Sequence, residues 1–300
     1  MQKLLDPTLD IVFKLLFTSG PDSDVALGGL LTAVLSPPRP IVSITVLNPL
    51  IAGVDVTDKG IALDLLLELD DGTQIDLEMQ SDKRHAFRNR ALFYWARLFG
   101  GKLERGDEYA RLKPAVSVLF LDYRELPGNR LHSIFHVLET HDHSRFSDAF
   151  EMHVIELPKL DRAADRADEE ALLRWSKFFT MTTTDEANDP AMRDPAIQKA
   201  RTILERLSAD PATQELARQR QLAQQTYRIE LSAALDAGIE KGRDEGRDEG
   251  RRDGLRTAIL DACALLGIVP TLEQRAELDE LDVAGLDALR ARLRADRRWA

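Results

Sequence analysis

The stretch that most constrains the fold of this chain runs from residue 59 to residue 80, with the sequence KGIALDLLLELDDGTQIDLEMQ. Residues 61–69 are rich in apolar side chains that suit a strand, and Asp70-Asp71-Gly72 is a turn signal. Polar and apolar residues then alternate, which is the period of a strand with one polar face. The stretch predicts a β-hairpin whose second strand carries Asp76, Glu78 and Gln80 on one face.

The register of this hairpin decides which acids meet. If Asp70-Asp71-Gly72 is a three-residue loop with Gly72 in the left-handed region, Leu69 faces Thr73. Asp64 then lies opposite Glu78 on the same face, with Cβ atoms about 5 Å apart. A two-residue turn would instead set Asp64 opposite Met79 and separate the acids. We expect the three-residue loop.

Two carboxylates at this separation repel each other by about 4 kcal/mol at an effective dielectric constant near 20. A shared proton, a basic side chain or a divalent cation must offset that repulsion. Hard oxygen ligands at this spacing suit Mg²⁺ or Mn²⁺. A hairpin that merely carries acids on a solvated face is the alternative that the residues leave open.

The residues around the hairpin resemble a known family. Asp64 followed after thirteen residues by Glu78-Met79-Gln80 resembles the D…(D/E)xK core of the PD-(D/E)XK nucleases, in an E-x-Q variant. The match extends to DPTLDIVFKLLF at 6–17, Asn48-Pro49, RNRALFY at 88–94 and HVIELPKL at 153–160. Together these motifs resemble the recombination-promoting nuclease and putative transposase branch of that superfamily, over residues 4 to about 160.

The resemblance implies roles for several residues. Asp64 and Glu78 would hold Mg²⁺ or Mn²⁺, with the Met79 carbonyl as a third ligand. Gln80 stands where the superfamily has lysine and would orient the attacking water, while Asp10 on the first helix would assist the metal site. The residues alone leave open an ordinary ion pair of Asp10 with Lys14, and whether Lys14 or another base replaces the missing lysine.

The charge distribution bears on nucleic acid binding. The net charge of −11 argues against a phosphate-binding surface. The segment from Asp82 to Lys113, however, holds nine basic residues and four acidic ones, and it begins directly after Gln80. Local charge decides phosphate contact, so DNA remains the expected partner. The candidate DNA-binding residues are Lys83, Arg88, Arg90, Tyr94 and Arg97. A solvated helix face is the alternative.

Two further sets of residues bound the chemistry. The one cysteine, Cys263, excludes an internal disulfide and a cysteine-cluster metal site, and we expect it to be a buried thiol. The histidines at 132, 136, 141, 143 and 153 lack the ligand spacing of a zinc site. We expect them to be solvated or to lie on an edge strand.

The chain organisation is that of an α/β protein with an extension. We expect a mixed sheet of about five strands flanked by helices within a nuclease-like domain at 1–160, followed by an all-helical region at 161–300. Asp6-Pro7 is expected to open the first helix as N-cap and N1. Aspartates at 6 and 10 interrupt what would be the apolar part of a signal peptide, and no apolar run could span a bilayer. We therefore expect a cytoplasmic protein without a membrane partner.

The extension contains a glycine repeat, GIEKGRDEGRDEGRRDG, with glycine at 238, 242, 246, 250 and 254. We expect one continuous helix, because acid–base pairs at helical spacing offset part of the cost of the glycines. The small-residue stripe would then pack closely on a neighbour, either the preceding helix or a second chain in a homodimer. A flexible hinge is the alternative.

Two functions follow from these observations. The first is a Mg²⁺-dependent DNA endonuclease that hydrolyses phosphodiester bonds, in the setting of recombination or transposition that the resemblance implies. The second is a catalytically inactive nuclease-fold scaffold that binds protein or DNA. The D…E-x-Q triplet favours the enzyme, while the acidic total and the glycine repeat favour the scaffold.

Overall fold

The computed structural model describes residues 3–47, 65–83, 86–101, 103, 106, 108–162, 169–181 and 192–299. The chain divides into two compact units, residues 1–222 and residues 223–300. The first unit contains the sheet, and the second is built from helices.

The first unit is organised around a mixed sheet with strand order β1-β2-β3-β4-β6-β5. Its strands are β1 (Ile44–Val46), β2 (Leu65–Leu69), β3 (Gln74–Gln80), β4 (Ala115–Leu121), β5 (His132–Phe135) and β6 (Phe150–Glu156). The β3–β4 and β4–β6 pairs are parallel and the other pairs are antiparallel. The central parallel strands are therefore covered on both faces, as β4 shows by being buried throughout.

The β2–β3 hairpin has the expected three-residue loop. Gly72 adopts φ +86°, and its N–H donates to the Leu69 carbonyl at 3.0 Å. The Leu69 N–H donates to the Thr73 carbonyl at 2.9 Å, so the strands leave the loop with Leu69 opposite Thr73. Four residues away from the loop on each strand, Leu65 is paired with Leu77, which is the same register.

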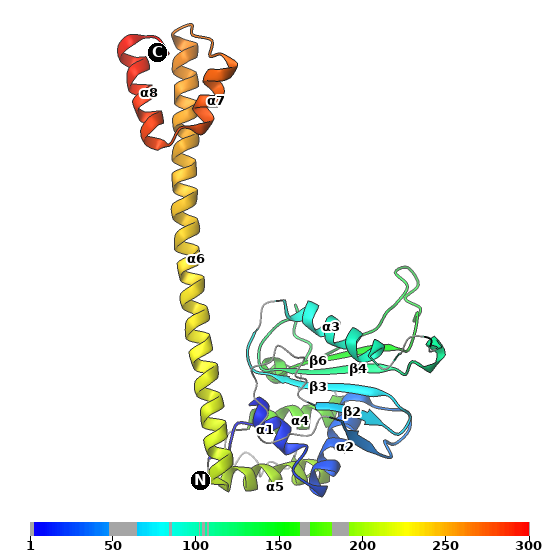
Figure 1. Ribbon diagram of the computed structural model, residues 1–300. Coiled ribbons are helices and arrows are strands. Elements are labelled where there is room, and N and C mark those ends of the chain that lie inside the picture. The colour runs from blue at the N-terminus through cyan, green and yellow to red at the C-terminus, as the bar shows by residue number, and fades with distance from the viewer. Residues whose placement is uncertain are drawn as a thin grey trace. The chain divides into compact units, whose positions relative to one another are not determined.

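Four helices cover one face of the sheet (Figure 1): α1 (Asp10–Leu16), α2 (Pro21–Leu35), α4 (Glu170–Thr180) and α5 (Pro195–Ala209). They bury a large apolar core against Ile75, Leu77, Val118 and Phe120. Aromatic rings fill its centre, with Phe13 in contact with Phe120 and Phe179 at centroid distances of 6.5 and 5.7 Å.

The other face is covered by α3 (Phe87–Gly100), as Figure 1 shows. Phe87 and Ala91 of α3 pack in a smaller cluster with Leu119, Leu121, Met152 and Val154 of β4 and β6. Leu119 and Leu121 are in register with Glu78 and Gln80, so the polar face of β3 and the α3 cluster lie on the same side of the sheet.

The expected α/β fold, a mixed sheet flanked by helices with a helical C-terminal region, is confirmed, with six strands among the described residues. One helix start was wrong. The α1 helix begins at Asp10 with Leu9 as its N-cap, instead of at Asp6-Pro7. Asp6 uses its carboxylate locally, because Oδ1 accepts hydrogen bonds from Thr8 N and Thr8 Oγ1 at 2.9 and 2.7 Å. That turn satisfies the backbone before the helix starts.

The boundary expected near residue 160 differs from the division of the structure after residue 222. The reason is that α4 and α5 complete the core under the sheet: Trp175, Phe178 and Phe179 are at most 1% exposed. Composition marked the change to helix, but these apolar faces belong to the first unit.

The second unit contains the C-terminal part of α6 (Pro211–Leu265), with α7 (Leu272–Glu280) and α8 (Val283–Asp296). The glycine repeat lies within one continuous helix, as expected. Leu255, Ile259 and Cys263 of α6 form a core with Leu278 of α7 and Leu286 and Leu289 of α8. Cys263 is 1% exposed, which confirms the expected buried thiol. Among the described residues, no helix is long and apolar enough to cross a membrane.

A buried ion pair closes the carboxyl end of β6. Glu156 and Lys159 are 0% and 1% exposed, and Lys159 Nζ donates to Glu156 Oε2 at 2.5 Å. Glu156 Oε1 also accepts the N–H groups of Glu125 and Leu126 at 2.7 and 3.1 Å. The pair therefore fixes the chain that follows β4 against the end of β6.

We predict that Lys159→Met lowers the free energy of unfolding by about 3–5 kcal/mol, because it leaves a buried carboxylate without its cation. Urea denaturation followed by tryptophan fluorescence measures the change. The matched control, Glu156→Gln with Lys159→Met, removes both charges and keeps the acceptor for the backbone N–H groups, so it should lose less than Lys159→Met alone. Equal losses in the two variants would contradict a role for charge pairing.

Candidate active site

The polar face of β3 is buried although its side chains are polar. Gln74, Asp76 and Glu78 are 6%, 1% and 4% exposed, and Gln80 is half-buried. They share a face because side chains of even-numbered residues on this strand point the same way. Asp76 is in register with Ser117 of β4, which is 0% exposed. Burying polar groups is costly unless they are hydrogen-bonded or paired, so several buried polar side chains on one face of a strand mark a candidate site.

Within this face, Glu78 and Gln80 contact each other directly. Gln80 Nε2 donates to Glu78 Oε2 at 2.8 Å, two residues along the strand. The amide therefore directs its oxygen away from the carboxylate. Gln80 Oε1 is buried and has no hydrogen-bond partner within the part of the chain that the structure describes. It is an acceptor placed beside a buried carboxylate.

Asp64, the expected partner of Glu78, lies just outside the described residues. The register of Leu65 with Leu77 and of Leu66 with Asp76 is the one that the sequence analysis required for pairing positions 64 and 78. The pairing itself stays a prediction. Among the described residues, no three histidine, cysteine or acidic side chains are grouped so that they could hold a metal ion.

Asp10 is held by an arginine far along the chain. Arg220 of α6 donates through Nε to Asp10 Oδ1 at 2.9 Å, and its Nη2 pairs with Oδ2. Asp10 Oδ1 also accepts the Ile11 N–H at 2.8 Å. A cation that used the Asp10 carboxylate would have to compete with this guanidinium. The role expected for Asp10 thus stays a proposal, with Arg220 as an added partner.

The five candidate DNA-binding residues come directly after β3 in the sequence. Lys83 and Arg88 are both 62% exposed at the side chain, and both pair with Glu125, at 3.4 and 3.1 Å. Arg90 lies over the ring of Tyr94, with 5.5 Å from Cζ to the ring centroid, and Arg97 is exposed in the last turn of α3. Arg90 and Tyr94, four residues apart on α3, therefore contact each other, whereas the link of Lys83 and Arg88 through Glu125 was not foreseen.

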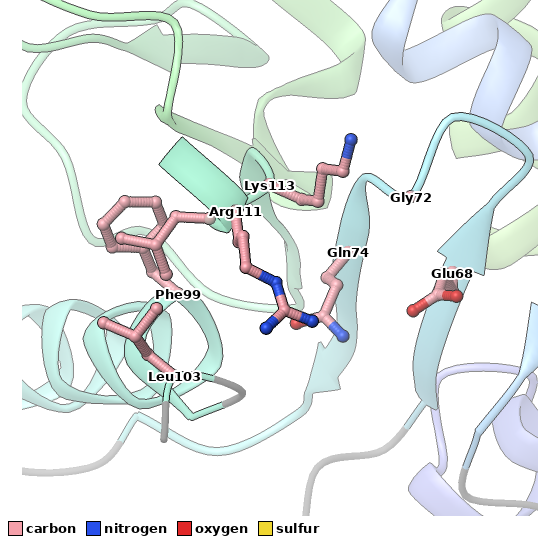
Figure 2. Close-up of a pocket in the computed structure, with 8 residues that line it drawn as sticks. Glu68, Gly72, Gln74, Phe99, Leu103, Arg111 and Lys113 are labelled. Carbon is pink, nitrogen blue, oxygen red and sulfur yellow. The ribbon is translucent and has the colours of Figure 1, made fainter. Parts of the chain in front are cut away.

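A pocket of about 300 Å³ lies at the opposite end of the hairpin from Gln80 (Figure 2). In Figure 2 the Arg111 guanidinium lies beside Gln74, with Phe99 and Leu103 on one side and Glu68 of β2 on the other. Gln74 and Glu78 are four residues apart, roughly 13 Å along a strand. The pocket is therefore separate from the Glu78–Gln80 pair, although it opens on the same face of β3.

The sequence analysis placed Asp76 on the polar face without selecting it as a site residue, although at 1% exposed it is more deeply buried than Glu78 at 4%. The strand alternation was the available signal, because positions 76, 78 and 80 share one parity. Glu125 was also missed. It lies in the loop after β4, and only the folded chain brings it to Lys83 and Arg88. No local sequence pattern indicated these contacts.

Two of the histidines that were expected to be solvated or on an edge strand, His132 and His153, form a buried pair. His132 lies on the edge strand β5 as expected, and it is buried, at 5% exposed. His153 is 1% exposed and lies on β6, between β4 and β5, so the expectation of a solvated or edge-strand position was wrong for it. His132 Nε2 and His153 Nδ1 are hydrogen-bonded at 2.8 Å, and His153 Nε2 meets Glu151 Oε1 at 2.7 Å. Burial, followed by the charges of His153 and Arg130, lowers the pKa of His132 from 6.5 to about 4.

The fold defines the class of this protein first: a mixed sheet flanked by helices, with an acid-bearing antiparallel hairpin leading into a parallel strand, is consistent with a PD-(D/E)XK nuclease core. The family model described as "PD-(D/E)XK nuclease family transposase" matches residues 7–234. The chain belongs to this family. No curated protein and no solved structure matched the chain.

We predict that His132 makes stability depend on pH. His132 stays neutral in the folded chain down to about pH 4, while the unfolded chain protonates it near pH 6.5. The unfolded state therefore binds more protons between these values, and the free energy of unfolding falls as the pH drops through this window, by an amount on the order of 3 kcal/mol. Urea midpoints of wild type and His132→Gln across this range measure the effect. A slope that the substitution leaves unchanged would contradict it.

Proposed function

We propose that this protein is a Mg²⁺- or Mn²⁺-dependent DNA endonuclease that hydrolyses phosphodiester bonds. The observation that carries the proposal is the Glu78–Gln80 pair, a buried carboxylate that accepts a 2.8 Å hydrogen bond from the residue in the lysine position of the family motif. The hairpin register that aligns positions 64 and 78 supports Asp64 as the second acid. Recombination or transposition is the setting that the family description suggests.

The donor set fits the proposed cation. Asp64 and Glu78 offer carboxylate oxygens and Met79 offers its backbone carbonyl, while its side chain is 3% exposed in the core on the other face of the sheet. Hard oxygen donors without nitrogen or sulfur match Mg²⁺ and Mn²⁺. When bound, such a cation supplies a water of lowered pKa and neutralises charge on the phosphate.

The residues of the chain supply the rest of the chemistry. Gln80 Nε2 keeps the Glu78 carboxylate oriented, and Gln80 Oε1 accepts a hydrogen bond from the attacking water. Glutamine carries no positive charge, so it positions the water without the electrostatic assistance that a lysine gives. Asp10 supports the site from α1, with Arg220 holding its carboxylate in place before the cation binds.

Lys83, Arg88, Arg90, Tyr94 and Arg97 are the proposed contacts to DNA. Cationic and phenolic side chains bind phosphate and so position the duplex without reading its sequence. The Glu125 carboxylate holds Lys83 and Arg88 together, which arranges two exposed cations in advance. A homodimer formed through the C-terminal helices completes the proposal.

We predict that the 300-residue chain nicks supercoiled plasmid only with Mg²⁺ or Mn²⁺, and that Asp64→Asn or Glu78→Gln lowers the rate at least 100-fold by removing a metal ligand. Gel electrophoresis of plasmid forms measures this. Asp70→Asn is the matched control, since it removes one carboxylate from the exposed loop of the same hairpin.

Mn²⁺ titration by calorimetry separates the enzyme from the inactive scaffold. Binding by wild type that is lost in Glu78→Gln supports the enzyme, and binding by neither protein supports the scaffold. Nicking that persists with excess chelator would contradict the proposed chemistry.

We predict next that Gln80→Lys keeps or raises the nicking rate, because an ammonium at this position still donates to Glu78 and adds the positive charge common in the superfamily. Gln80→Leu keeps the size without a donor, and we expect it to lose at least ten-fold. Single-turnover rates at saturating Mg²⁺ measure both. Equal rates for the lysine and leucine variants would remove Gln80 from the mechanism.

A further inference from the structure

Two buried polar side chains in the middle of the sheet have no part in the proposed chemistry. Asp76 of β3 is 1% exposed and Ser117 of β4 is 0% exposed, and the two are in register on neighbouring parallel strands. Ser117 Oγ has no hydrogen-bond partner within the described ranges of the chain. A buried hydroxyl without a partner is costly to desolvate, so it indicates a water or ligand that the chain itself does not supply.

Both side chains share a face of the sheet with Glu78 and Gln80. Asp76, Glu78 and Gln80 occupy alternate positions of β3, so they point the same way. Leu119, which is in register with Glu78, packs in the cluster beneath α3, and Ser117 comes two residues earlier on the same strand. Ser117 therefore faces the α3 side as well, next to Asp76 and diagonally across from Glu78.

The spacing suits oxygens that lie one shell outside a cation held by Glu78. Asp76 comes two residues before Glu78, about 6.6 Å along the strand, and Ser117 lies about 4.8 Å away on the next strand. Aspartate is one methylene shorter than glutamate, so its carboxylate stays closer to β3 than that of Glu78 does. A water bound to the cation can donate to oxygens roughly 4–5 Å from the ion, which covers this gap.

Mg²⁺ and Mn²⁺ need acceptors of this kind around them. Both prefer about six oxygen ligands in an octahedral arrangement, and Mg²⁺ keeps several of its waters when it binds a protein. The proposed function supplies two carboxylates and one backbone carbonyl, so water fills the other positions. The hydrogens of these waters require acceptors in a buried site. Gln80 Oε1, the Asp76 carboxylate and Ser117 Oγ are acceptors on the same face.

We propose that Asp76 and Ser117 are positioning residues of the metal centre, which hydrogen-bond to waters of a cation at Glu78 and do not touch the cation themselves. This inference rests on the proposed function and adds two residues to it. Gln80 accepts a hydrogen bond from the attacking water in that function, so Asp76 and Ser117 hold other waters and fix the orientation of the hydrated ion. Removing such an outer partner typically weakens metal binding by about 10- to 100-fold.

Calorimetric titration of the 300-residue chain with Mn²⁺ tests the two residues. Asp76→Asn should raise the dissociation constant for Mn²⁺ at least ten-fold. Ser117→Ala should raise it at least three-fold, and because this change removes no charge, its effect reports the hydrogen bond alone. The matched control is Ser176→Ala on α4, which covers the opposite face of the sheet. Ser176 is also 0% exposed, and its hydroxyl has no partner in the described part of the chain, so its removal should leave the constant unchanged.

Water-proton relaxation counts the waters on bound Mn²⁺ and separates a positioning role from direct ligation. If Asp76 acts through a water, wild type and Asp76→Asn carry the same number of waters on the ion at saturating Mn²⁺. One additional water in the variant would make Asp76 a direct ligand and would overturn the proposal. Urea denaturation without metal shows that each variant keeps its fold. Ser117→Ala, which removes a single oxygen, carries the test if Asp76→Asn does not fold.

Failure of this inference and failure of the proposed function give different results. Unchanged Mn²⁺ affinity in the folded Asp76 and Ser117 variants, with plasmid nicking by wild type intact, would overturn the positioning role and leave the enzyme in place. Weakened affinity in both variants, without nicking by wild type, would overturn the enzyme and support the positioning role at the metal site. A wild type that binds no Mn²⁺ would overturn both.

Discussion

The left-handed backbone of Gly72 determines which side chains of β3 face each layer of the protein. Its φ of +86° closes a three-residue loop and sets Leu69 opposite Thr73. A slip of one residue would turn Asp76 and Glu78 into the aromatic core beneath the sheet, because strand side chains alternate with period two. Carboxylates there would be buried among apolar groups, so the apolar residues between the acids hold the register as firmly as the loop does.

The sheet was predictable because its strands carry their own signals. Residues 115–121 are apolar except for Ser117, a run typical of a buried strand, and β4 spans the same residues. The hairpin was predictable to the register, since Asp70-Asp71-Gly72 lies between two apolar runs. Helix starts were harder to predict. Asp6 has the residue type of a helix N-cap, but its carboxylate accepts a hydrogen bond from Thr8 in a local turn. Aspartate is common both at N-caps and in such turns, so the residue type does not distinguish them.

The polar contacts around the candidate site could not be predicted, for a different reason. Asp10 and Arg220 are 210 positions apart, and Glu125 joins Lys83 and Arg88 only once β3, α3 and the loop after β4 are assembled. Lys159 and Glu156 are three residues apart, yet neither type is normally buried, so the sequence argued for exposure. Such contacts depend on tertiary placement, and a local pattern carries no information about it. The alternation of side chains along the strand was enough to place Asp76, Glu78 and Gln80 on one face, but it gave none of these tertiary contacts.

The glycine repeat makes the long helix α6 energetically unfavourable in a single chain. Five glycines between 238 and 254 cost a helix roughly 5 kcal/mol relative to alanine. The ion pairs along this stretch, Lys241 with Glu245 at 3.7 Å and Arg247 with Asp244 at 2.9 Å, return about 0.3–0.5 kcal/mol each. No tertiary contact of the described residues covers the glycines, since a Cβ on each would meet nothing within 4 Å. Local interactions therefore leave this segment unfavourable by several kcal/mol, while exposed Leu231 and Leu235 before it and Ile239 within it keep their apolar surface in water. Burying that surface against a second helix would offset both costs at once, which is why the same residues that destabilise one copy of the helix favour a pair.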